Sequence, residues 1–149
     1  MPSEAVNEAT RREWRHLGFF YELNDDGKEW RLVGSPSGLL KFRDLLMHYV
    51  ANPRNEAKSE HDHYGPYMYL KILTWSEAGV DGNAIYGTLQ DLCQLAGIID
   101  AKLQDARPGT ELRIQEDFAE GCEYCLVLDV RDEGFDPASA DPELSKGAG

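Results

Sequence analysis

The feature that most constrains the fold of this chain is a pattern of strand, capped helix and strand that occurs twice. The first helix follows Gly34 and Ser35, and the second follows Gly87 and Thr88. Serine and threonine are favoured at the residue that caps a helix N-terminus. The two helices carry apolar side chains at matching positions, which are Leu39, Phe42, Leu45, Leu46 and Val50 in the first copy and Leu92, Leu95, Ile98, Ile99 and Leu103 in the second. This spacing predicts one apolar face on each helix.

A strand with matching apolar positions follows each helix, with Leu70 and Ile72 in the first copy and Leu126 and Leu128 in the second. Two copies in series give the order β-α-β-β-α-β, which is the ferredoxin-like order. In that order both helices cover one face of an antiparallel sheet. We therefore expect an α+β fold with a duplicated β-α-β unit. An added strand should come from an N-terminal hairpin, which the turn signal Asn-Asp-Asp-Gly at 24–27 predicts.

The limits of the folded part follow from length and local composition. A chain of 149 residues has the length of one domain, and we place a single α+β domain at residues 11–131. Residues 1–10 are polar, and residues 132–149 are rich in Pro, Gly, Ser and acidic residues. Segments of this composition bury little apolar surface. Both termini are therefore predicted to be flexible.

The strand before Trp75 has two faces of different character. Side chains alternate along a strand, so one face should turn toward the helices with Met68, Leu70, Ile72 and Thr74, and the other away from them with Tyr67, Tyr69, Lys71, Leu73 and Trp75. Exposed apolar patches mark interfaces, where Tyr and Trp are frequent hot spots. The predicted binding residues are Tyr64, Tyr67, Tyr69 and Trp75, with His61 and His63 at the rim. Two alternatives are that a terminal segment covers this face, or that the face forms a homodimer.

Charge and cysteine content restrict the partner and the compartment. The chain has 27 acidic and 15 basic residues and a formal net charge of −12. Such a surface repels nucleic acid and anionic lipid, and it either suits a basic protein partner or serves only solubility. The sequence contains no apolar run long enough to span a bilayer, and its N-terminus does not resemble a secretory signal. Three cysteines cannot all pair within one chain, which fits a reducing compartment. We therefore expect a cytoplasmic protein that binds neither membrane nor nucleic acid.

The stretch EHDHYGPY at 60–67 contains the strongest candidates for chemistry, His61 and His63. With Cys122 and Cys125 they would have the donor types of a zinc site. In the expected fold, however, the strands that carry the histidines and the cysteines lie at opposite edges, about 14 Å apart. The sequence also lacks a nucleophile elbow, a phosphate-binding glycine loop and a His-Glu-x-x-His motif. We therefore expect no metal, no cofactor and no catalytic residue.

A resemblance to a known class of protein adds to this interpretation. The segments SPSGLLKFRDLL at 35–46 and EHDHYG at 60–65 resemble small immunity proteins of bacterial polymorphic-toxin systems. The resemblance implies an acidic, cytosolic, non-enzymatic protein that blocks a cognate toxin, with no catalytic residues. The leading hypothesis is thus a non-enzymatic protein-interaction module, with an immunity-type inhibitor of a basic toxin as its specific form. The alternative is a small ferredoxin-like dimeric enzyme that uses His61 or His63 as its acid–base group.

Overall fold

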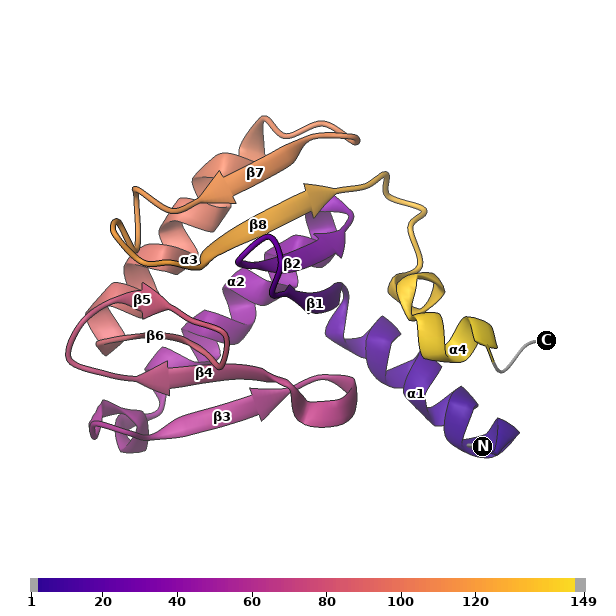
Figure 1. Ribbon diagram of the computed structural model, residues 1–149, viewed down its shortest axis with the longest axis horizontal. Coiled ribbons are helices and arrows are strands. Elements are labelled where there is room, and N and C mark those ends of the chain that lie inside the picture. Colours follow the sequence, from indigo (N-terminus) through magenta and orange to yellow (C-terminus); the bar gives the residue numbers. More distant parts are fainter. Residues whose placement is uncertain (1–2, 147–149) are drawn as a thin grey trace.

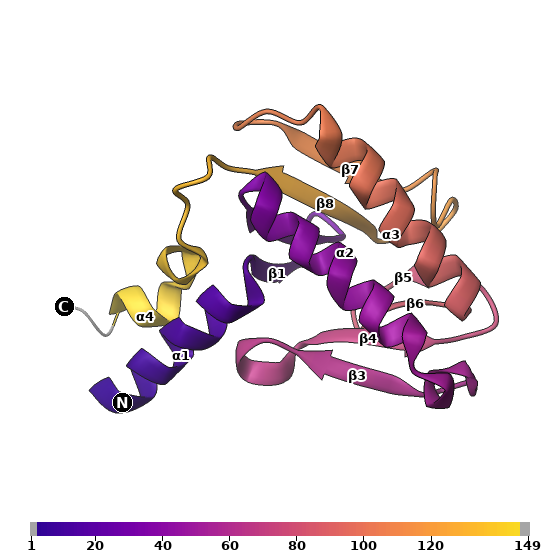
Figure 2. The same ribbon diagram turned by 180° about the vertical axis from the view of Figure 1, so that it is seen from behind.

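The chain folds into two four-stranded sheets packed on one side of a pair of long helices (Figures 1 and 2). The computed structural model describes residues 3–146. The helices are α1 (Glu4–Leu17), α2 (Pro36–Ala51), α3 (Leu89–Gln104) and α4 (Pro142–Lys146), with short 3-10 helices η1 (Pro53–Glu56), η2 (Pro66–Met68) and η3 (Pro137–Ala140). The strands are β1 (Phe20–Asn24), β2 (Glu29–Gly34), β3 (His61–Tyr64), β4 (Leu70–Thr74), β5 (Gly79–Val80), β6 (Ile85–Gly87), β7 (Glu111–Ile114) and β8 (Cys125–Val130).

The duplication is present, but its unit is larger than the expected β-α-β. Each half of the chain forms a hairpin, a long helix and a second hairpin, so that β1-β2-α2-β3-β4 corresponds to β5-β6-α3-β7-β8. The hairpins pair across the halves, in the orders β1-β2-β8-β7 and β3-β4-β6-β5. The central pairs β2–β8 and β4–β6 are parallel, with Leu32 opposite Leu128 and Ile72 opposite Ile85. Each sheet is therefore built from both halves.

The α+β class and the N-terminal hairpin are confirmed, whereas the single antiparallel sheet is not. The difference arises from β3 and β5. The sequence of β3 is the polar stretch HDHY, and β5 has only two residues, so neither has the apolar alternation that predicts a strand. With these strands included, α2 and α3 each have one hairpin before them and one after them in the sequence. The four hairpins form two mixed sheets.

The predicted helix caps and apolar faces agree with the structure. The Ser35 side chain accepts a hydrogen bond of 3.0 Å from Gly38 N, and Thr88 forms a capping box with Asp91. Helices α2 and α3 lie side by side (Figure 2). The residues of the two stripes that are fully or almost fully buried are Leu39, Phe42, Leu46, Leu92, Leu95, Ile99 and Leu103. The core therefore lies between the helix pair and the two sheets.

The first helix was not expected, because its sequence is mostly polar. Ser3 caps α1 by accepting a hydrogen bond from Val6 N. Near the other end of the helix, Trp14 is 1% exposed, and its ring centroid lies 4.9 Å from that of Phe20 and 5.1 Å from that of Tyr21. One buried tryptophan thus attaches the helix to strand β1, and most of the N-terminal segment that was expected to be flexible belongs to this helix. Residues 1–2 lie outside the described part of the chain.

The C-terminal segment also differs from the expectation of a flexible tail. Residues 132–146 return along α1, where η3 and α4 pack beside that helix (Figures 1 and 2). Leu144 is buried, and Arg15 on α1 forms a two-pronged ion pair with Asp136. The composition of the segment is typical of disorder, but a few apolar and charged contacts hold it on the helix. Residues 147–149 lie outside the described part.

Candidate interaction site

The connection between β3 and β4 presents three consecutive large side chains to solvent. Tyr67, Met68 and Tyr69, here called the ridge, are 45%, 59% and 68% exposed. Tyr67 and Met68 have positive φ values of 67° and 60°. This left-handed conformation costs roughly 1–2 kcal/mol for each residue that has a Cβ. The break in regular strand geometry turns Met68 outward, so its predicted position on the helix-facing side is wrong.

A buried tyrosine holds the ridge in this conformation. The hydroxyl of Tyr21 lies within hydrogen-bonding distance of the carbonyl oxygens of Tyr64 and Pro66, and it accepts a hydrogen bond of 3.2 Å from Tyr69 N. Burial raises the pKa of this phenol. Gly65 has a φ of 76°, and a Cβ added there would lie 2.6 Å from Cε2 of Tyr21. Close packing of strand β1 against the connection therefore fixes the backbone of the ridge.

Asp141 supports the same ridge from the C-terminal segment. Its Oδ2 accepts hydrogen bonds of 2.7 Å from the Tyr67 hydroxyl and 2.8 Å from Trp14 Nε1. Burial and the hydrogen bond to this carboxylate raise the pKa of Tyr67. The ridge is thus attached to α1 and to the segment before α4, which are at opposite ends of the sequence.

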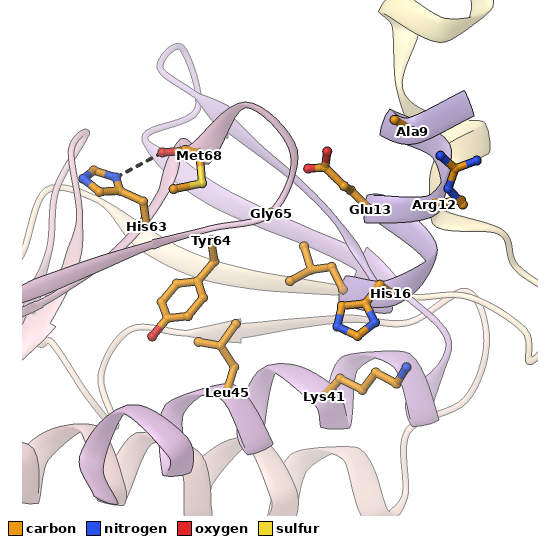
Figure 3. A pocket seen from close by; sticks show the side chains of 11 residues that line it. Ala9, Arg12, Glu13, His16, Lys41, Leu45, His63, Tyr64, Gly65 and Met68 are labelled. Carbon is orange, nitrogen blue, oxygen red and sulfur yellow. Dashed lines mark hydrogen bonds between the residues drawn. The ribbon is translucent and has the colours of Figure 1, made fainter. Parts of the chain in front are cut away.

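One side of the ridge faces a cleft of about 760 Å³ between α1, α2 and strand β3. Figure 3 shows its side chains: Glu13 and His16 extend from α1, Lys41 from α2, and Met68 from the ridge. His63 lies at the far end from His16, with its Nδ1 3.0 Å from the Met68 carbonyl oxygen (Figure 3). We call this hollow the histidine cleft. Its polar groups are spread along the wall rather than gathered around one point.

The other side of the ridge faces a second cleft of about 480 Å³. Its aromatic lining consists of Trp14, Phe20, Tyr21, Trp30, Tyr67 and Tyr69. The charged residues that line it are all acidic, namely Glu22, Asp141 and Glu143, within the part of the chain that the structure describes. We call this hollow the aromatic cleft. Consecutive ridge residues therefore face two hollows of different chemistry.

The structure distributes the six predicted site residues over several places. Tyr67 and Tyr69 line the aromatic cleft, whereas His63 and Tyr64 line the histidine cleft. His61 is exposed and lines neither of them. Trp75 lies at the other end of β4, about 20 Å from Tyr69 at the usual strand rise. It is 38% exposed, and Nζ of Lys58 lies 4.3 Å from its ring centroid.

Tyr64 contributes a ring rather than a reactive group to the histidine cleft. Its hydroxyl is buried and has no hydrogen-bond partner among residues 3–146. Burial, together with the negative charge of Asp62, raises the pKa of this phenol. Figure 3 shows the ring turned toward α2 and Leu45.

The two histidines of β3 are neighbours. Their ring centroids lie 5.3 Å apart, and each Nδ1 lies 3.0–3.1 Å from a backbone carbonyl oxygen. A carbonyl can only accept, so these contacts favour the proton on Nδ1. Over residues 3–146, no group of three or more His, Cys, Asp or Glu side chains is placed to hold a metal ion. Cys125 lies in the other sheet, where burial raises its pKa.

The floor of the aromatic cleft was missed by sequence reasoning. Trp14, Tyr21 and Trp30 come from a polar helix and from two strands of the N-terminal hairpin. The concentration of aromatic residues between positions 14 and 30 was the signal available. Local spacing did not show that these rings would meet the ridge.

Comparisons of the chain with protein-family models, curated proteins and solved structures found no match. No helix within residues 3–146 is both long enough and apolar enough to cross a membrane. A function for the site must therefore be argued from its geometry and charge.

Proposed function

We propose that this chain is a non-enzymatic interaction module and that its ridge binds a basic protein partner. The observation that carries the proposal is the exposure of Tyr67, Met68 and Tyr69 on a backbone that is left-handed at Tyr67 and Met68. A rigid surface loses little conformational entropy on binding, and tyrosine is frequent among the residues that dominate binding energy. The hydrogen bonds that Tyr21 accepts from Tyr69 N and that Asp141 accepts from the Tyr67 hydroxyl provide that rigidity.

The charge of the molecule supports a basic partner. A formal net charge of −12 accelerates encounter with a positively charged protein and repels other acidic surfaces. Together with the resemblance of residues 35–46 and 60–65 to immunity proteins, this favours an inhibitor of a basic toxin that acts in the cytoplasm. In this proposal the acidic surface steers the toxin and the ridge makes the central contact.

Affinity capture from the native cell tests the proposal with a matched pair of variants. Tyr69→Ala removes the most exposed ridge side chain and should reduce recovery of the specific partner at least tenfold. Trp75→Ala removes an exposed aromatic residue at the other end of the same strand and should leave recovery unchanged. Both variants must retain the circular dichroism spectrum of the wild type. Equal recovery with the two variants would show that the ridge is not the binding surface.

The histidine cleft favours a second candidate, a small enzyme with an acid–base histidine. The cleft is large enough for a metabolite, and His16, His63 and Glu13 line it. Incubation with a cell extract, followed by mass spectrometry, would show depletion of a substrate. His63→Ala should abolish that depletion if the cleft is catalytic. A gel-filtration measurement would show whether the chain forms the dimer that this alternative assumes.

A further inference from the structure

We propose that the aromatic cleft receives an arginine side chain of the partner, held between the ridge tyrosines and Glu22. The inference rests on the proposed interaction function and assigns the chemistry of one subsite within it. Its basis is the combination of ring geometry and charge in a hollow of about 480 Å³.

The rings of the cleft form a floor and a wall. Trp14, Tyr21 and Trp30 are almost fully buried and make the floor. Tyr67 and Tyr69 form the exposed wall, with ring centroids 5.9 Å apart and ring planes inclined by 32°. The Tyr67 ring also meets Trp14 edge-on at 6.3 Å. A planar guanidinium can stack on such ring faces, because their π electrons attract a cation.

The charges around the rings select a cation over an anion. Among the described lining residues there is no lysine, arginine or histidine, whereas Glu22 and the Asp141 carboxylate are present. Glu22 lies exposed on β1 and forms no ion pair with another residue in the range 3–146. A carboxylate beside an aromatic wall can accept two hydrogen bonds from a guanidinium while the rings contact its plane.

The opposite side of the ridge provides an internal contrast. The histidine cleft contains Arg12 and Lys41 beside one carboxylate, Glu13, so a guanidinium there would meet two basic side chains as well as an acidic one. The ridge thus separates a hollow of mixed charge from one whose charged lining residues, among those described, are all acidic. A basic segment that crosses the ridge is therefore directed toward the Tyr69 side.

Binding of N-acetyl-arginine amide tests the inference without the partner. The chain has three tryptophans, of which Trp14 and Trp30 line the aromatic cleft and Trp75 lies elsewhere. In a proton–nitrogen NMR titration, the indole signals of Trp14 and Trp30 should shift with a dissociation constant in the millimolar range. The Trp75 signal should stay in place. The neutral isostere N-acetyl-citrulline amide should bind at least tenfold more weakly.

Two variants and one control locate the site. Tyr69→Ala and Glu22→Gln should each weaken arginine amide binding at least threefold, whereas Glu56→Gln, beside Trp75, should not. Equal binding of the citrulline and arginine amides, or no shift of the Trp14 and Trp30 signals, would overturn the inference. So would a wild-type dimer that Tyr69→Ala converts to a monomer, because a second copy would then occupy the cleft. If arginine amide fails to bind but Tyr69→Ala still abolishes partner capture, the interaction function stands and only the arginine subsite is wrong.

Discussion

The indole N–H of Trp14 donates a hydrogen bond of 2.8 Å to Oδ2 of Asp141 and so joins α1 to a segment at the opposite end of the chain. The same carboxylate oxygen accepts the hydroxyl hydrogen of Tyr67 on the ridge. Both donors belong to residues that line the aromatic cleft. The termini are therefore part of the candidate site, and disturbing either of them should alter the ridge.

Asp141→Ala should destabilise the protein by about 1–3 kcal/mol, because the Trp14 indole N–H would remain buried without an acceptor. The free energy of unfolding in urea measures the loss. Glu77→Ala, a change at an exposed carboxylate in a turn, serves as the control and should change stability by less than about 0.5 kcal/mol. Faster proteolysis within residues 132–146 of the Asp141 variant should accompany the loss. Unchanged stability would mean that this contact does not hold the termini together.

Tyr21→Phe should loosen the ridge while leaving the core packed. The substitution removes the hydroxyl that accepts from Tyr69 N and contacts the Pro66 carbonyl oxygen, a loss of about 1–2 kcal/mol. Hydrogen exchange should become faster at the amides of residues 65–69. Tyr124→Phe is the matched control, since it removes a hydroxyl hydrogen-bonded to the exposed Asp25. Similar exchange in the two variants would contradict the proposed role of Tyr21.

Gly65→Ala should destabilise the fold more than Gly109→Ala. Both glycines have positive φ values, 76° and 91°, so each alanine meets a backbone penalty of roughly 1–2 kcal/mol. At Gly109 a new Cβ would have no neighbour within 4 Å, whereas at Gly65 it would meet Tyr21. The difference between the two unfolding free energies isolates that collision. Equal losses would show that strand β1 can move away from the ridge connection.

The ion pair between Arg15 and Asp136 should contribute to stability only above acidic pH. A hydrogen bond from the Arg15 guanidinium lowers the pKa of Asp136 below its ordinary value of 3.8. A lowered carboxyl pKa gives stability that is present above the unfolded-state pKa and lost as pH falls through the folded-state value. Both side chains are substantially exposed, at 52% and 40%, so the contribution is below about 1 kcal/mol.

Arg15→Gln measures this contribution. The variant should be less stable than the wild type at pH 7, and the difference should disappear once Asp136 is protonated. Urea unfolding at pH 7 and at successively lower pH values gives the free energy of unfolding of the wild type and of the variant as a function of pH. A difference that persists after protonation would assign the effect of Arg15 to packing rather than to charge.

The sequence by itself determined the caps and buried faces of the two long core helices and the inward side of one strand. The caps at Ser35 and Thr88, the buried stripes of α2 and α3, and the inward positions of Leu70 and Ile72 all follow from spacing that a few neighbouring residues define. Alternation over residues 67–75 also indicated that Tyr69 would point away from the helices, and Tyr69 is exposed. These features depend on contacts close in sequence, which is why they could be predicted.

Only the tertiary structure decided how the hairpins pair and where the clefts lie. The apolar pattern of β8 does not show which strands will pair with it. Its parallel alignment with β2 depends on residues far apart in the chain. Trp14 and Asp141 show the same limit: one lies in a polar helix and the other in a segment of disordered composition, yet both are buried and a hydrogen bond joins them. Burial of a side chain depends on all the elements around it, so two termini that bury little apolar surface separately become ordered where they meet.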